Sequence, residues 1–486
     1  MSNSKEVVAK NLFWKILERI GSQAVTLVVS VVLARLLEPE AYGTVALVTM
    51  FTTVLQVFVE SGMATSLIQK KNADDVDFSS MFYFNVFVSL VLYLAIYLCA
   101  PLIAKFYNKP ELVVLTRVLS ITVLVTGMRN VQQAYIAKHM MFKKTFLSTL
   151  IGSIVSSVVG IYMAYAGYGV WALVATQLVS VVVAVIVMWV VVPWKPKLIF
   201  SAHRLKELLR FGGNVLVVGV WTKIFEKIRG LIIGKFYTTT DLAFYEKGNQ
   251  IPYLLFSTVN SSIDSVLLPT LSNNGQDDNE RLKAMARRSM RCSTYLVAPC
   301  MAGLAAVAIP MVTLLFTEKW LQCVPYLQIF CLAYIFYPQR TVNHNVILSV
   351  GHSDWYMKME IVRATIGLIV VVISATISVK AMIVSILIMA ILETTINAIP
   401  CQKMFGYGWI SQMKDIIPYI LLSLFMGIPV YFLQFLSLPV AVILLLQVLA
   451  GVFVYVGISS ILKLEEYVYL KTIVVNFVKR KNIRTR

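Results

Sequence analysis

Long runs of apolar residues recur along the chain between Leu12 and Leu462, and only short polar breaks separate them. Because a transmembrane helix needs about 20 mostly apolar residues, these runs predict about fourteen membrane-spanning helices. The predicted ranges are 12–37, 41–65, 81–104, 112–134, 146–166, 169–193, 208–234, 241–268, 286–316, 323–348, 356–378, 380–404, 413–434 and 438–462. No break is long enough for a soluble domain, so we expect an all-α polytopic membrane protein.

A weak internal repeat divides this pattern. A basic residue, a short turn and an aromatic residue follow the first span at 35–42, and the same order follows the seventh span at 235–245. The spacing of roughly 200 residues is typical of transporters built from two parallel repeats, which bind substrate between the halves. We therefore predict two pseudo-symmetric six-helix lobes, joined by the basic segment 193–210. The predicted parts are residues 1–195, residues 206–405, two additional spans at 412–462, and a basic cytoplasmic tail at 463–486.

Composition agrees with a membrane protein and sets its orientation. Hydrophobic residues make up 58% of the chain and charged residues 14%, against about 25% charged in a soluble domain. The net charge of +19 comes mainly from basic residues in the loops on one side of the predicted membrane. Lys and Arg favour that side by roughly four to one. This bias places both termini in the cytoplasm, next to anionic lipid headgroups. We expect no nucleic-acid partner.

Motifs for metal, cofactor or enzymatic chemistry are missing from the sequence. The six cysteines form no C-x-x-C pair, and the four histidines are scattered, so we expect neither a disulfide framework nor a metal site. There is no P-loop and no dinucleotide-binding fingerprint. The sequence therefore predicts no cofactor and no enzyme.

Eight basic residues lie inside the predicted spans, where each costs about 2.5–3.5 kcal/mol at the bilayer centre. Such residues must line a hydrated interior or pair with acids. The first functional hypothesis is therefore a cationic cavity that binds an anion. The eight residues are Lys15, Arg19, Arg117, Arg129, Lys223, Lys227, Arg229 and Arg340.

The seventh span carries the most informative group. Lys223, Glu226, Lys227 and Arg229 lie near its middle, too deep for easy snorkelling to water. Lys223 and Lys227 share one face, and three cations outnumber one anion. The alternative is a closed salt-bridge cluster with acids from other spans, for which the candidates are Glu18, Glu60, Asp264 and Glu393.

Other charged positions are open to two interpretations. In the first span Lys15, Glu18 and Arg19 share a face, which either lines the inner mouth of a cavity or snorkels to water. Arg117 and Arg129 are expected to snorkel. We predict an anionic-headgroup site formed by Lys15, Arg19, Lys223, Lys227, Arg229 and Arg340, with Glu18, Glu226, Asp264 and Glu393 as coupling or pairing acids.

Several motifs resemble polysaccharide flippases of the multidrug/oligosaccharidyl-lipid/polysaccharide exporter superfamily. LARLLEPEAYG at residues 33–43 is similar to the family's L-A-R-L-L-G-P-E-x-Y-G, although Glu38 replaces its usual glycine. VESGMATSLIQ at 59–69 looks like the family's D-x-G-l-x-x-A-L-I-Q. Further similar stretches lie at 137–143, 167–173 and 350–354.

The resemblance implies two lobes around a central cavity that opens alternately to each side of the bacterial inner membrane. The implied substrate is an oligosaccharide on undecaprenyl pyrophosphate, for lipopolysaccharide or another surface polysaccharide, with polysaccharide polymerase machinery as a candidate partner. One alternative is an ion-coupled multidrug or small-molecule exporter of this fold, but eight intramembrane bases against five acids favour an anion. A second alternative, a glycan polymerase or ligase, typically needs a large outward loop.

Overall fold

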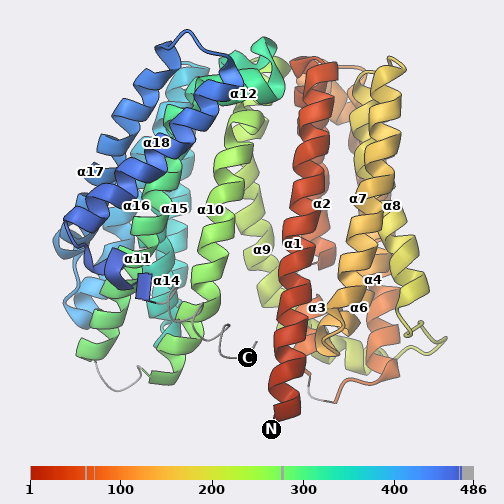
Figure 1. Ribbon diagram of the computed structural model, residues 1–486. Helices are drawn as coiled ribbons and strands as arrows, with labels where there is room; N and C mark the ends of the chain where they lie inside the picture. The colour runs from red at the N-terminus through yellow and green to blue at the C-terminus, as the bar shows by residue number, and fades with distance from the viewer. Residues whose placement is uncertain (1, 61–62, 71, 275–278, 470, 473–486) are drawn as a thin grey trace, which may run out of the picture. The chain divides into compact units, whose positions relative to one another are not determined.

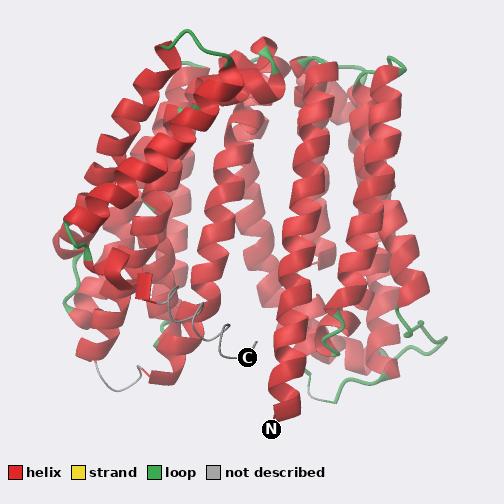
Figure 2. Ribbon diagram, viewed as in Figure 1, coloured by secondary structure: helices red, strands yellow, loops and turns green. Residues whose placement is uncertain are grey.

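The computed structural model describes residues 2–60, 63–70, 72–274, 279–469 and 471–472. Every regular element in these residues is a helix, as Figure 2 shows. Packing divides the chain into two units, Met1–Ala243 and Phe244–Arg486. Each unit is described by itself.

Long helices build the first unit, and Figure 1 shows α1, α7 and α8 running side by side. The helix α7 packs against both neighbours, whereas α9 packs against α2, α3 and α4. The elements are α1 (Ser2–Leu36), α2 (Pro39–Glu60), α3 (Met63–Gln69), α4 (Asp75–Tyr107), α5 (Leu112–Leu119), α6 (Ile121–Lys138), α7 (Phe142–Tyr165), α8 (Val170–Val191), α9 (Ala202–Phe236) and the start of α10 (Thr239–Asn274).

The second unit contains the rest of α10 and a bundle in which α11 packs on α17, while α13, α14 and α15 pack on α16. Its further elements are α11 (Asn279–Ala306), α12 (Ala308–Phe316), η1 (Glu318–Cys323), α13 (Val324–Tyr334), α14 (Tyr337–Ser349), α15 (Ser353–Ala375), α16 (Val379–Phe405), α17 (Trp409–Phe432), η2 (Leu433–Phe435) and α18 (Val440–Ile461).

The all-α polytopic fold is confirmed. Among the described residues, nine helical stretches are long and apolar enough to cross a membrane, and a tenth is the pair α11 and α12, bent by 68°. Helices also occupy the other four predicted ranges, but α1, α9, α10 and α15 are outside this set. The number fourteen therefore stays a prediction.

Local sequence explains one break inside a predicted span. The range 323–348 consists of α13 and α14, and Pro338 lies in the first turn of α14. Proline has no N–H, and its ring disfavours the helical conformation of the preceding residue, so a helix readily starts afresh there.

Small residues bring α9 close to α2. A Cβ atom at Gly230 would lie 2.2 Å from Met50 Cε, and one at Gly234 would lie 2.3 Å from Leu47 Cδ2. Such glycines let membrane helices approach closely, where van der Waals packing drives association. By packing, α9 thus belongs with α2–α4. The boundary between the two lobes, placed by the sequence at residues 195–206, stays a prediction.

Candidate functional site

The basic group predicted on the seventh span lies on α9, and we call Lys223, Glu226, Lys227 and Arg229 the α9 cluster. Lys223 Nζ lies 2.6 Å from Glu226 Oε2, and these side chains are 40% and 50% exposed. Lys227 is partly buried and makes no ion pair with another described residue. The single carboxylate of the cluster is thus engaged by Lys223.

Helix geometry connects the α9 cluster with the packing of α9 on α2. Lys223, Lys227, Gly230 and Gly234 follow one another at four, three and four residues, so they share one stripe. The glycine part of the stripe is closed against Met50 and Leu47. At the other end of the stripe, the Lys223 side chain is 40% exposed and Lys227 is partly exposed. Cations exposed in this way can contact water.

A second group of charges lies inside the second unit and joins three helices. Arg340 of α14 approaches Glu360 of α15 at 3.1 Å and Glu393 of α16 at 3.6 Å. Arg363, also on α15, approaches the same two carboxylates at 2.5 and 3.7 Å. We call these four residues the buried ion cluster. Two cations face two anions, so the cluster is electrically balanced.

Neutral polar side chains continue the buried ion cluster. His344 Nε2 lies 3.8 Å from Glu360 Oε1 and 3.3 Å from Asn397 Oδ1. Nearby, Gln339 donates from Nε2 to Gln412 Oε1 at 2.6 Å, and Gln412 donates to Asn343 Oδ1 at 3.1 Å. Buried polar groups need such partners because each unpaired one costs free energy. This part of the second unit is therefore a polar core within an apolar bundle.

The structure brings only some of the predicted site residues together. Lys223 and Glu226 meet on α9, and Arg340 meets Glu393 in the other unit. Arg229 of α9 interacts with another group of the protein. Glu18 of α1 does so too, and it is partly buried. The side chains of Lys15, Arg19 and Asp264 lie outside the described residues. The substrate-binding role of these residues stays a prediction.

Two of the acids proposed as partners for the seventh span, Glu60 and Glu393, are engaged elsewhere. Glu60 pairs with Arg129 at 3.5 Å, and Glu393 pairs with both arginines of the buried ion cluster. Arg129, which the sequence leads us to expect to snorkel to water, thus also has an acidic partner in the protein. Arg117 stacks over the Tyr97 ring, 4.2 Å from its centre.

Sequence reasoning missed Glu360 and Arg363. Neither residue is among the charged positions that the sequence pattern singles out. Their signal was present, because an acid and a base three residues apart share a helix face.

Solved structures of transporters share this fold. The structure matches that of the lipid II flippase MurJ in its inward closed conformation with a TM-score of 0.76 and 16% identity, over 93% of this chain and 98% of that one. An inward-facing multidrug resistance MATE transporter of the MOP superfamily matches with a TM-score of 0.62 and 16% identity, over 79% and 95%. The chain has the fold of this transporter superfamily.

Sequence comparison then shows the family. The chain belongs to the polysaccharide biosynthesis protein family, whose profile matches residues 32–325, more than half of the chain. It is 24% identical to the succinoglycan biosynthesis transport protein ExoT of Rhizobium meliloti, over 85% of this chain and 82% of that protein. It is 24% identical to the lipopolysaccharide biosynthesis protein WzxC of Escherichia coli, over 65% of each. The resemblance read from the motifs is confirmed: the chain is a multi-pass membrane protein of this family, and the proteins to which it is similar include a transport protein and a flippase.

Proposed function

We propose that the chain flips an undecaprenyl-pyrophosphate-linked oligosaccharide across the bacterial cytoplasmic membrane by alternating access, for surface polysaccharide biosynthesis. Family membership supports the glycan class, since similar proteins are named for succinoglycan transport and lipopolysaccharide biosynthesis. Both termini face the cytoplasm in this proposal, and lipid-linked oligosaccharide and membrane lipids are the partners.

The observation that carries the proposal is the α9 cluster. Lys223 is 40% exposed on a helix of an apolar bundle and holds the carboxylate of Glu226, while the neighbouring Lys227 makes no ion pair with another described residue. A pyrophosphate brings about two negative charges into a low-dielectric slab, and charge-assisted hydrogen bonds from Lys and Arg compensate them. The lipid tail stays in the bilayer while the headgroup crosses.

Within this proposal Lys223 and Lys227 are the main headgroup contacts. Arg340 is a weaker candidate, because two carboxylates already lie within 3.6 Å of its guanidinium. A substrate phosphate would have to displace at least one of them. The multidrug alternative needs an uncompensated acid for a cationic drug, and each of the four intramembrane acids whose side chains the structure describes already has a partner.

The test is glycan export in cells that lack the chain and are complemented with variants. We expect the double variant Lys223→Gln, Lys227→Gln to reduce export at least tenfold with the protein at its normal level in the membrane. Arginine at both positions should retain part of the activity, because charge is kept while geometry changes.

A matched control is Lys206→Gln, which removes an exposed cation from the same helix outside the predicted span. It should leave export unchanged. Normal export by the double glutamine variant would refute the headgroup role of the α9 cluster. Resistance to cationic drugs without any effect on glycan export would instead support the multidrug alternative.

A further inference from the structure

A stripe of neutral polar side chains runs along α10, in the middle of the predicted span 241–268. We call Asn249, Tyr253, Ser257 and Asn260 the α10 stripe. They follow one another at four, four and three residues, so they lie on one face of the helix. No charged residue belongs to the stripe, which distinguishes it from the α9 cluster and from the buried ion cluster.

Tyr253 presents an open aromatic ring. Its side chain is 56% exposed, and its ring lies 6.5 Å from that of Tyr334 on α13, with 51° between the ring planes. The hydroxyl of Tyr253 makes no hydrogen bond to another residue in the part of the chain that the structure describes. The ring and its polar tip are therefore both available to a ligand.

Asn249, one turn before Tyr253, is held by the same neighbour. The Tyr334 hydroxyl donates to Asn249 Oδ1 at 2.7 Å. This bond engages the amide oxygen and leaves the amide nitrogen with two donor hydrogens. Among the described residues no acceptor receives them, and Asn249 is only half-buried. Tyr334 thus positions an open ring and an open hydrogen-bond donor side by side.

A packed group of aromatic residues supports Tyr334. Its side chain is 6% exposed, and its ring stacks on Phe256 at 5.2 Å with only 6° between the planes. Tyr337 of α14 contacts the same ring edge-on at 4.8 Å. Binding groups are held precisely when their supporting side chains are locked by packing. The support for Asn249 and Tyr253 is of this kind.

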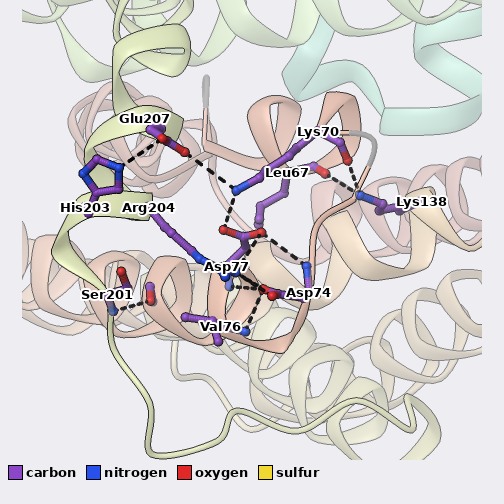
Figure 3. Close-up of polar contacts among 11 residues, drawn as sticks. Leu67, Lys70, Asp74, Val76, Asp77, Lys138, Ser201, His203, Arg204 and Glu207 are labelled. Atoms are coloured by element: carbon purple, nitrogen blue, oxygen red, sulfur yellow. Dashed lines mark hydrogen bonds and ion pairs between the residues drawn. The ribbon is translucent and has the colours of Figure 1, made fainter.

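Polar groups that serve packing look different, as the start of α4 in Figure 3 shows. There the buried Asp77 carboxylate binds Lys70 at 2.7 Å and lies 3.8 Å from Arg204. Lys138 in turn donates to Leu67 O at 3.2 Å. These groups satisfy one another within the first unit. Contacts between helices account for the oxygen of Asn249, but not for its amide nitrogen or for the Tyr253 hydroxyl.

Contact with lipid chains does not account for these groups either, because hydrocarbon offers them no hydrogen-bond partner. The exposed side chains of α18 include Leu449, Val452 and Phe453, as expected of a surface that faces lipid. The α10 stripe carries amides and hydroxyls at the same positions along its helix instead. It suits a hydrated space within a transporter.

The chemistry of the open groups fits a sugar ring. A pyranose has a face of C–H groups, and an aromatic ring attracts them because its own face carries partial negative charge. Around that face lie hydroxyls that accept from an amide N–H and both donate to and accept from a phenol. Specific ligand sites commonly combine an aromatic surface with a few placed polar groups. A neutral stripe also suits the uncharged part of a substrate.

Resting on the proposed transport function, we propose that Tyr253 and Asn249 bind a sugar ring of the lipid-linked oligosaccharide. The ring stacks on Tyr253, and the Asn249 amide donates to one of its hydroxyls. Tyr334 is a positioning residue for both. On this proposal the charge of the headgroup and the sugars of the cargo are recognised by different helices, α9 and α10.

Binding of two probes tests this proposal. One probe is the lipid-linked oligosaccharide that accumulates in cells lacking the chain, and the other is undecaprenyl pyrophosphate without sugar. Both carry radioactive phosphorus, and binding is measured on purified chain in lipid nanodiscs. We expect the unmodified chain to bind the first probe at least about tenfold more tightly, because stacking and hydrogen bonds add to the headgroup contacts.

The variants Tyr253→Ala and Asn249→Ala should each weaken binding of the oligosaccharide probe about tenfold and leave the sugar-free probe within about twofold. Tyr253→Phe keeps the ring and should retain most of the affinity. Tyr334→Phe removes the hydroxyl that holds Asn249 and should weaken binding of the oligosaccharide probe alone. The matched control is Tyr162→Ala on α7, which removes a 71% exposed tyrosine and should change neither affinity.

Melting temperatures of the same samples report folding, and Tyr253→Leu repeats the test with the bulk of the side chain kept. Equal loss of both probes, or undiminished binding of the oligosaccharide probe by Tyr253→Ala and Asn249→Ala, would overturn the sugar contact. Equal affinity of the unmodified chain for both probes would also overturn it, while the proposed function would stand. Binding of neither probe by the unmodified chain would refute the proposed function itself.

Discussion

Glu360 contacts both guanidinium groups of the buried ion cluster, at 3.1 Å from Arg340 and 2.5 Å from Arg363. Removing one partner of a buried ion pair leaves an uncompensated charge, whereas replacing all partners by apolar groups is often neutral. Single substitutions in the cluster should therefore be more damaging than the number of lost contacts suggests.

The change Glu360→Gln should lower the free energy of unfolding by about 3–5 kcal/mol, because it leaves two arginines facing one carboxylate. Thermal unfolding in detergent, followed by tryptophan fluorescence, measures the effect. The control is Glu280→Gln, since Glu280 is 83% exposed and 3.6 Å from Lys283. Such surface pairs contribute at most about 1 kcal/mol. Equal melting temperatures for both variants would contradict the importance of the cluster.

Gly43 at the start of α2 permits a close contact with the backbone of Thr239. A Cβ atom at Gly43 would lie 1.7 Å from Thr239 O, so Gly43→Ala must displace a backbone segment. We expect a clearly lower melting temperature and yield. Gly457→Ala on α18 should leave both unchanged or slightly raise them, because no atom lies within 4 Å of the added carbon. An unchanged melting temperature and yield for Gly43→Ala would show that the backbone at Thr239 can move away from position 43 without a cost in stability.

At the scale of the element, the start of α4 shows how one residue serves a helix and a tertiary contact together. Asp74 accepts from the N–H groups of Val76 and Asp77, and a capping box is complete because Asp77 accepts from the Asp74 N–H. The same Asp74 carboxylate receives Arg204 of α9. The helix start is thus also the anchor of α9.

This anchor has a defined pH dependence. The hydrogen bond from Arg204 holds the pKa of the Asp74 carboxyl below its usual value. The carboxylate therefore stabilises the fold above the pKa of the unfolded chain, and this contribution is lost as pH falls through the lower folded pKa. Asp74→Asn should lower the melting temperature at pH 7, and the difference from the unmodified chain should shrink as the pH falls below about 3.9, the usual pKa of an Asp carboxyl.

Asparagine still caps a helix, so the expected loss comes from the charge rather than from the cap. Asp354→Asn in the first turn of α15 is the control, since Asp354 is exposed and 3.8 Å from Lys358. A difference between Asp74→Asn and the unmodified chain that persists at low pH would contradict the ion-pair explanation.

The helices were predictable because long apolar runs admit few other structures in a membrane. The partner of each charge was not predictable in the same way. Arg340 and Glu393 are 53 residues apart and meet only because α14 packs on α16. The contacts of the segment between α8 and α9 were hidden for a similar reason, since the sequence indicated only that a basic segment joins two lobes, while in the structure Trp194 is buried and the Lys197 N–H donates to Ser79 of α4.

At the scale of the whole molecule, the distribution of charge predicts the orientation in the membrane. Reporter fusions at Met140, in the exposed turn between α6 and α7, should report the cytoplasm. Fusions at Asn108, which caps the other end of α4, should report the outside. Basic residues next to Met140 remain in the cytoplasm during insertion, which gives this expectation its physical reason. The reverse pattern would overturn the orientation.

The α9 cluster has an electrical consequence. Three cations and one anion give it two net positive charges, which a bound pyrophosphate with about two negative charges would neutralise. A membrane potential acts on moving charge with about 2.3 kcal/mol per elementary charge per 100 mV. On the proposed mechanism binding of the headgroup thus leaves the cluster almost insensitive to the voltage, while the inside-negative potential acts on the empty cluster in the direction of the cytoplasm. The balanced buried ion cluster adds no charge to either step, so voltage would drive the return of the carrier rather than the passage of its cargo.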